Sequence, residues 1–433
     1  MAPPIAPTFV AGGDTQAKAE LTHWWRRFGD PVLDRLITRA LAQNLDIKTA
    51  IAHIDAARAV RGISRAGLFP QIGLGASAER ERLSGYQARA LDSSTDNQIG
   101  AFATASWEPD LFGRIRGGVR AGSAELVATQ EDERAVRVAL IGEITSLYFQ
   151  VRGLDARIKI VEESTQAQQK TALLTRRLFD AGAVPIADVD RAQAQAATTG
   201  GGKSERELER QIVIHRLAQL LAQPPEMMYA TLAPPAVVAM PGTPIGAGVP
   251  ADLLRQRPDV RAAEARVLAA YARLGVAEAD LKPRLTLQGS IGALISGFTG
   301  VGLTKAFSWL IGGALDQTLF DGGRKRSTIN LRRAEASAAA LAYQAAVLQA
   351  VTDVENALAA TSRDQEREDL LLQASEKARA ASDQVFRGWK SGEIAFLDVL
   401  EAQRTSLAAD DSLAIAQTSI AVDQTRLITA IGG

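Results

Sequence analysis

The chain has 433 residues, of which 46% are hydrophobic and only 5% aromatic, and its 49 basic side chains are balanced by 49 acidic ones. A net charge of zero gives no electrostatic support for a nucleic-acid partner. The absence of cysteine excludes disulfides, thiolate metal sites and cysteine nucleophiles. His23, His53 and His215 are scattered without metal-ligand spacing, so no metal, cofactor or enzymatic activity is expected.

Residues 1–22 are rich in Pro, Gly and Ala and are interpreted as an extended N-terminal arm. Met1 leads into Ala-Pro-Pro with neither a basic start nor an apolar run, so no signal peptide is predicted. No run of eighteen apolar residues occurs, which argues against a transmembrane helix. Transmembrane strands of ~10 alternating residues leave a much weaker trace, so a membrane protein is not excluded.

Residues 23–223 form the first of two predicted structural repeats. Short helices come first, and then the hydrophobic period changes to two, which predicts strands at about 71–85 and 98–110. One face of these strands is small and apolar, and the other is polar except at Phe102. The helical period then returns without proline from about 112 to 181 and predicts one very long helix, followed by a tight turn and a return helix.

Residues 224–250 are rich in Pro, Gly and Ala and are interpreted as a linker. Residues 251–433 then repeat the first pattern, with strands predicted at about 284–296 and 307–320, a long helix at about 324–390, a tight turn and a return helix. This similarity between the two halves indicates a tandem duplication.

The duplication is clearest at the two turns, where Phe179–Gln193 is echoed by Trp389–Gln403. An offset of 210 residues places Gly182 on Gly392 and Asp188 on Asp398. A turn between antiparallel helices often needs a positive φ, which glycine adopts at low cost, so Gly182 and Gly392 are predicted turn residues.

Asp398 and Glu401 are three residues apart at the start of a predicted helix, so both carboxylates lie on one face. Acids in the first turn of a helix also complement its dipole, which is worth ~0.3–1 kcal/mol and requires no further function.

The chain resembles the outer-membrane factor family, the TolC and OprM type of trimeric efflux duct, and is most similar to its lipoprotein branch. The resemblance covers residues 23–432. Its specific segments are Trp24-Trp25 through Phe28-Gly29-Asp30-Pro31, Trp107 to Arg114, Leu253 to Glu264, Leu319 to Arg324, and Gly392 through Leu397-Asp398-Val399-Leu400.

The resemblance implies a mainly α-helical trimer in which four strands from each chain close a twelve-stranded β-barrel, continued by a long periplasmic α-helical barrel. It implies an exit duct in the outer membrane of a Gram-negative cell, with outer-membrane lipid around the barrel. The implied partners are two further copies of the chain, a periplasmic adaptor (membrane fusion protein) and an inner-membrane pump of the resistance-nodulation-division type. The lipoprotein branch carries an acylated N-terminal cysteine, so lipid anchoring would require a cysteine that this sequence lacks.

The resemblance also assigns roles at the turns. Repeated around the threefold axis of the implied trimer, Asp398 and Glu401 would form two acidic rings that raise the local cation concentration. Asp188 corresponds to the acid of a latch that ties neighbouring turns in the closed duct, and Trp389 stands where an aromatic hydroxyl commonly completes it. Ile394 stands where some members carry arginine, so a closed tip held partly by apolar packing is expected. The alternative to a duct is a soluble coiled-coil scaffold, in which the period-two segments form a small globular sheet.

Overall fold

The computed structural model describes residues 8–10, 23–82, 84–85, 95–233, 250, 252, 256–298 and 302–433. Most of the predicted N-terminal arm and residues 234–249 of the predicted linker lie outside this set. Within the described part of the chain, no helix contains a stretch long and apolar enough to cross a bilayer.

The chain divides into two compact units that cut across the two predicted repeats. One unit comprises Ala52–Gln130 and Ala262–Tyr343. The other comprises Ala2–Ile51, Glu131–Arg261 and Gln344–Gly433. Each unit takes segments from both halves of the sequence, so the repeat is a unit of sequence and not of packing.

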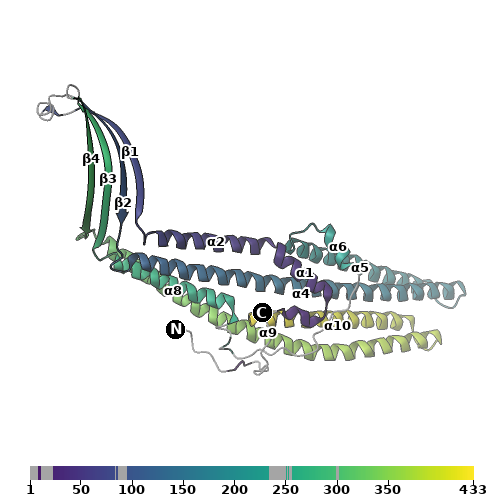
Figure 1. Ribbon diagram of the computed structural model, residues 1–433. Helices are drawn as coiled ribbons and strands as arrows, with labels where there is room; N and C mark the ends of the chain where they lie inside the picture. Colours follow the sequence, from purple (N-terminus) through teal and green to yellow (C-terminus); the bar gives the residue numbers. More distant parts are fainter. Residues whose placement is uncertain are drawn as a thin grey trace. The chain divides into compact units, whose positions relative to one another are not determined.

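The first unit contains one antiparallel sheet in the order β1-β2-β3-β4 (Figure 1). Its strands are β1 (Gln71–Arg82), β2 (Thr95–Trp107), β3 (Arg284–Phe298) and β4 (Gly302–Asp316). The central pairing of β2 with β3 joins the two sequence repeats. Because β1 and β4 each pair on one side only, the sheet has two open edges within the chain.

Three of the four predicted strands differ from the observed ones in their bounds. β1 ends at residue 82 where residue 85 is predicted. β2 runs from 95 to 107 where 98–110 is predicted, and β4 runs from 302 to 316 where 307–320 is predicted. Pairing of Arg82 with Thr95 extends the ladder beyond the apolar alternation, which is why β2 begins earlier than the pattern indicates. It ends before Pro109, which has no N–H for the ladder.

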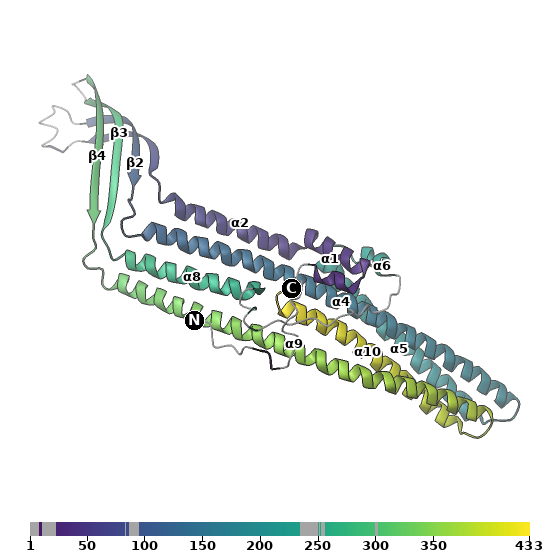
Figure 2. The ribbon, with the colours of Figure 1, turned by 60° about the horizontal axis from the view of Figure 1, so that its bottom comes forward.

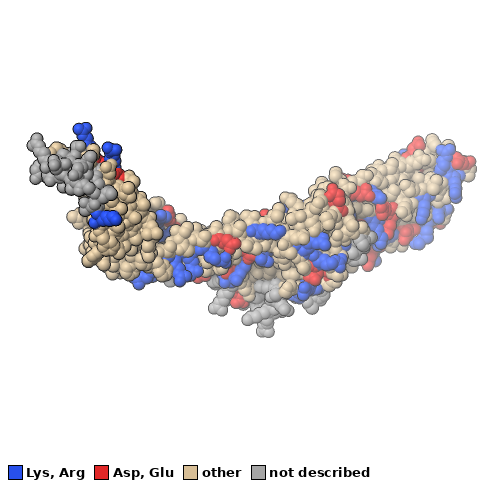
Figure 3. Space-filling model, turned by 45° about the horizontal axis from the view of Figure 1, so that its top comes forward, with Lys and Arg blue, Asp and Glu red and all other residues tan. Residues whose placement is uncertain are grey.

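The two faces of the sheet differ as the alternation predicts. Directly paired residues share a face, and one such face carries large apolar side chains that are exposed in the single chain. The visible side of the sheet is mainly uncharged, whereas charged side chains are dense over the helices (Figure 3). The exposed apolar residues of this face are Ile72, Leu74, Ile99, Trp107, Leu287, Ile291, Ile295, Phe307, Trp309, Ile311 and Leu315.

Aspartate side chains cap the two long helices, α4 (Arg114–Asp180) and α9 (Arg324–Lys390). The Asp110 carboxylate accepts hydrogen bonds from the backbone N–H of Ile115 (3.2 Å) and Arg116 (2.7 Å). Asp321 accepts in the same way from Lys325 (3.0 Å). These bonds satisfy N–H groups that have no partner within the helix. The segments Trp107 to Arg114 and Leu319 to Arg324 therefore each contain the cap of the long helix that follows a strand.

The remaining helices are η1 (Trp24–Phe28), α1 (Pro31–Gln43), α2 (Leu45–Ala66), α5 (Ile186–Leu220), α6 (Glu226–Leu232), α8 (Pro258–Ala279) and α10 (Phe396–Ala430). In the second unit, α4 with α5 and α9 with α10 form two antiparallel hairpins (Figure 2). Its core contains Trp24, Trp25 and Phe28 of η1, packed with Phe149 of α4. Trp24 and Trp25 are thus core residues of this unit.

The helices α5 and α10 end in the same way. In both, backbone N–H groups after the last turn bond back to earlier carbonyls, from Gln223 to Ala218 and from Gly433 to Ile428. Such an ending requires a positive φ, which Gly432 supplies at +99° and Ala222 at +52°. Alanine in this conformation costs ~1–2 kcal/mol, so the first repeat retains the backbone of the second at an energetic cost.

Candidate functional site: the paired helix turns and helix-end anchors

The turns of the two hairpins have one hydrogen-bond pattern. The N–H of Gly182 donates to the carbonyl of Phe179 (2.8 Å), and the N–H of Gly392 donates to that of Trp389 (3.0 Å). In each turn the next residue bonds five residues back, which completes a Schellman motif. Gly182 and Gly392 have φ of +75° and +82°, the conformation that the sequence predicted for them.

An apolar cluster joins the two hairpins beside these turns. Trp389 is 8% exposed, and its ring centroid lies 5.2 Å from that of Phe396 and 5.8 Å from that of Phe386. All four hairpin helices contribute, so the contact fixes one hairpin against the other. The buried members of this tip cluster are Ala172, Ala192, Trp389, Phe396, Val399 and Leu400.

The predicted acids lie outside the tip cluster. The Asp188 carboxylate is an ion-pair partner of Arg191 at 3.2 Å within α5. The side chains of Asp398 and Glu401 are exposed, and Glu401 lies 3.4 Å from Arg404. The structure thus brings Asp398 and Glu401 to the start of α10, and places Asp188 and Trp389 on different hairpins.

Ile394 has a defined position in its turn. A Cβ added to Gly388 would lie 2.6 Å from the Cδ1 of Ile394, so the isoleucine covers this glycine closely. The residue that stands in place of arginine is therefore used for packing within the second turn. A glycine at 388 leaves the space that this packing requires.

A partly buried charge cluster farther along the hairpins was not predicted from the sequence. Asp411 of α10 accepts from Arg157 of α4 (2.8 and 3.1 Å) and from Arg206 of α5 (3.2 Å). Burial raises the pKa of Asp411, but the hydrogen bonds from the two arginines outweigh burial and lower the pKa overall. Nothing in the local sequence distinguishes these residues from charges on solvated helix faces, because both arginines are more than two hundred positions away from Asp411.

Two different side chains hold the ends of the return helices. The buried Asn44 amide donates to the carbonyl of Leu220 at the end of α5 (2.8 Å). At the corresponding place in the second repeat, the Arg257 guanidinium donates to the carbonyl of Ala430 at the end of α10 (3.0 Å). The two helix-end anchors, Asn44 and Arg257, thus satisfy equivalent carbonyls with different chemistry.

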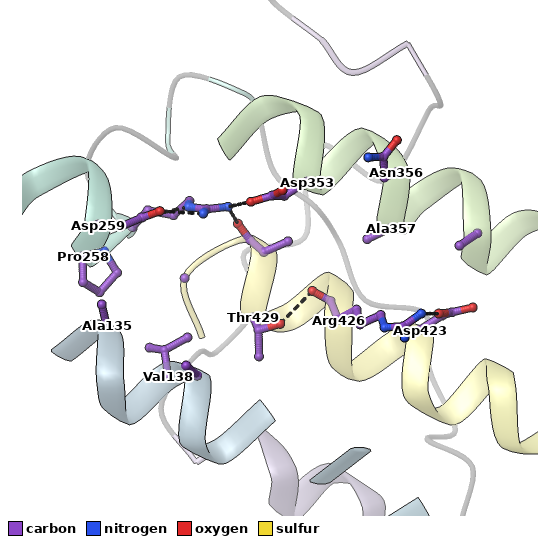
Figure 4. Close-up of a pocket in the computed structure, with 15 residues that line it drawn as sticks. Ala135, Val138, Pro258, Asp259, Asp353, Asn356, Ala357, Asp423, Arg426 and Thr429 are labelled. Carbon is purple, nitrogen blue, oxygen red and sulfur yellow. Dashed lines mark hydrogen bonds and ion pairs between the residues drawn. The ribbon is translucent and has the colours of Figure 1, made fainter. Parts of the chain in front are cut away.

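The Arg257 anchor is one of the residues that line a cavity of about 670 Å³. Asp259 and Asp353 line the same cavity (Figure 4). The Arg257 guanidinium forms a bidentate pair with Asp259 (2.7 and 3.0 Å) and a further bond to Asp353 (2.9 Å). Burial raises the pKa of Asp259, but the hydrogen bonds and charge of Arg257 outweigh it and lower the pKa overall. The described residues hold no group of three or more His, Asp and Glu side chains suited to a metal ion.

The comparisons with known proteins agree with this architecture. The profile of the outer membrane efflux protein family matches residues 36–223 and 249–433, one segment in each repeat. Nodulation protein T of Rhizobium leguminosarum bv. viciae is 32% identical, over 99% of this chain and 88% of that protein. The pyoverdine export outer membrane protein OpmQ of Pseudomonas putida is 30% identical, over 99% of this chain and 92% of that protein.

Among solved structures, the outer-membrane channel OprN superposes with a TM-score of 0.90 at 31% identity, over 100% of this chain and 99% of that one. The predicted fold class is confirmed, since a mostly helical chain with one four-stranded sheet matches the trimeric channels that combine a β-barrel with a helical barrel. The soluble scaffold alternative is not supported. The family is one of transport channels, and the chain belongs to the outer membrane efflux protein family.

Proposed function

We infer that the protein is the passive exit duct of a tripartite efflux system, receiving substrates from an inner-membrane pump of the resistance-nodulation-division type through a periplasmic adaptor. The observation that carries this proposal is a sheet with one exposed apolar face and two open edges. Open sheet edges are not tolerated in lipid, so strands from several chains must close on one another. Three chains would supply the twelve strands of such a barrel, with the apolar face toward lipid.

The absence of cysteine makes this assembly directly testable. Single cysteines at Ser77 of β1 and Ser308 of β4, combined in one chain (Ser77→Cys with Ser308→Cys), give reactive thiols on the two edge strands. In isolated outer membranes, a bis-maleimide reagent is expected to give dimers and trimers and no larger species, with the cysteine-free chain as control. Recovery of the protein as soluble, uncross-linked monomers would contradict the duct.

Asp398 and Glu401 are proposed to form the two acidic rings at the entrance of the duct. Their exposed carboxylates would concentrate cations in the pore. The double substitution Asp398→Asn with Glu401→Gln is expected to lower the cation-to-anion permeability ratio about two- to tenfold in planar bilayers, corresponding to ~0.4–1.4 kcal/mol. Glu366→Gln on α9, where the carboxylate is also exposed and paired with an arginine, is the matched control. Equal permeability ratios in the double variant and the control would refute the ring assignment.

Asp188 and Trp389 are proposed to hold the resting tip, with different contributions. Asp188 has an intrahelical ion pair of a kind that is worth only ~0.3–0.5 kcal/mol, so its latch role depends on a contact with a neighbouring chain. Trp389 contributes through the apolar tip cluster. The substrate is proposed to be selected by the pump, because a water-filled duct offers little discrimination.

A further inference from the structure

Phe102 interrupts the polar face of the sheet at a position that the duct function does not explain. It pairs directly with Gly75 of β1 and Gly292 of β3, so glycine stands on both sides of the phenylalanine. Its side chain is 42% exposed on this face. Aromatic cover of strand glycines stabilises a sheet, which accounts for one benefit of the arrangement.

The ring lies against the sheet. A Cβ added to Gly75 would lie 2.4 Å from the Cε2 and 2.6 Å from the Cζ of Phe102. A Cβ added to Gly292 would lie 2.9 Å from the Cβ of Phe102. A larger residue at position 75 would displace the ring, and one at position 292 would collide with the Ala101 carbonyl oxygen and the Cβ of Phe102. The two glycines therefore allow the close packing that keeps this aromatic surface low on the wall of the sheet.

Two leucines extend this surface on the same face. Leu294 covers Gly100, whose added Cβ would lie 3.2 Å from the leucine Cδ1, and Leu310 is 59% exposed. We define Phe102, Leu294 and Leu310 as the lumenal platform. The other inward residues around it are all uncharged: Gly73, Ser77, Thr104, Ser290, Ala306 and Ser308.

The platform lies on the face that is polar elsewhere, which in the proposed barrel faces the water-filled lumen. The lumen widens with strand number, so a ring held low on the wall of a twelve-stranded barrel leaves the path open. An exposed aromatic face in water attracts planar aromatic groups by offset stacking. The hydroxyl groups of Thr104, Ser290 and Ser308 can form hydrogen bonds with a polar substituent of such a solute. None of the platform side chains is charged, so the platform does not favour an ionic solute.

We propose that the lumenal platform is a weak binding site for small, uncharged, planar aromatic solutes on the exit path, one site in each chain. The inference rests on the proposed duct, because only there does this face line the lumen. The site is reached from the outer mouth of the barrel, so its occupation does not require the tip to be open.

The test uses the full-length trimer in nanodiscs and 4-fluorobenzyl alcohol, whose fluorine NMR relaxation reports binding. Phe102→Leu retains apolar cover over the glycines but removes the aromatic face, and is expected to weaken binding about two- to tenfold. Phe102→Tyr retains the face and is expected to bind like the parent. Phe307→Leu is the matched control, because Phe307 is 71% exposed on the opposite, apolar face of the same sheet.

Binding that is equal in the Phe102→Leu, Phe307→Leu and parent trimers would overturn the site and leave Phe102 as cover for the glycines alone. The saturated analogue cyclohexylmethanol should show no dependence on residue 102, and an equal loss for both probes would also overturn stacking. Trimer formation and pore conductance are measured on the same samples. A conducting trimer without the site contradicts this inference only, whereas a protein that forms no channel contradicts the proposed duct.

Discussion

Replacing Trp389 with alanine is expected to open the resting tip. The indole is buried in the tip cluster, where it contacts Phe386 and Phe396. Removing a buried aromatic side chain typically costs ~3–5 kcal/mol, which exceeds the contribution of any exposed ion pair at the turns. The Trp389→Ala trimer should therefore show higher conductance in planar bilayers, and cells that carry it should become more sensitive to vancomycin.

Two variants separate packing from a polar latch. Trp389→Phe retains an apolar ring and should behave nearly like the parent. Asp188→Ala removes the acid that lies outside the cluster, and its proposed latch role predicts higher conductance and vancomycin entry in this variant as well. A response to Asp188→Ala alone would assign the closed state to polar contacts between chains. Unchanged conductance in Trp389→Ala, with normal trimer levels, would remove the tip cluster from the gate.

Loss of the Arg257 anchor is expected to have the second large effect. In the Arg257→Met chain, Asp259, Asp353 and the carbonyl of Ala430 lose their common partner. Removing one partner of a fully buried ion pair costs ~3–5 kcal/mol, and solvent screening of the two partly exposed aspartates brings the expected cost below this range. The trimer should melt at a lower temperature, with earlier proteolysis at the C-terminal end of α10.

The anchor also predicts a pH dependence. The pKa of Asp259 is lowered in the folded chain, so its contribution to stability is present above the ordinary value of 3.8 and is lost as the pH falls through the folded pKa. The loss of stability on acidification should therefore be smaller in Arg257→Met than in the parent. Arg363→Met, which removes an exposed pair with Glu366, is the control and should melt like the parent. Identical melting of both variants would show that the anchor contributes nothing.

The sequence was most informative where a single strong signal marked an element. The long helix predicted at 324–390 is observed at Arg324–Lys390, because Asp321 supplies its N-terminal cap and Gly392 ends it with a positive φ. Strand ends were less predictable, since β2 continues through polar residues that are held only by pairing with β1. Hydrophobic alternation cannot report pairing of this kind.

The candidate site shows the same division. The two glycine turns could be predicted because a local backbone requirement selects glycine. The burial of Trp389 against Phe396 could not, because it depends on how one hairpin packs on the other. Arg257 lies within the segment Leu253 to Glu264, which is part of the family resemblance. Its partner carbonyl at Ala430 is nevertheless 173 positions away in the sequence. Contacts across such separations leave no periodic trace in a single sequence.

The difference between the two helix-end anchors has a consequence for the symmetry of the assembled duct. Six return helices in a trimer would have nearly the same backbone ending, but a neutral amide holds three of them and a charged guanidinium holds the other three. Acid weakens only the charged anchors, because it protonates the Asp259 carboxylate that pairs with Arg257, whereas the Asn44 amide does not titrate. The backbone is close to sixfold symmetric in its helix ends, and its response to acid is threefold.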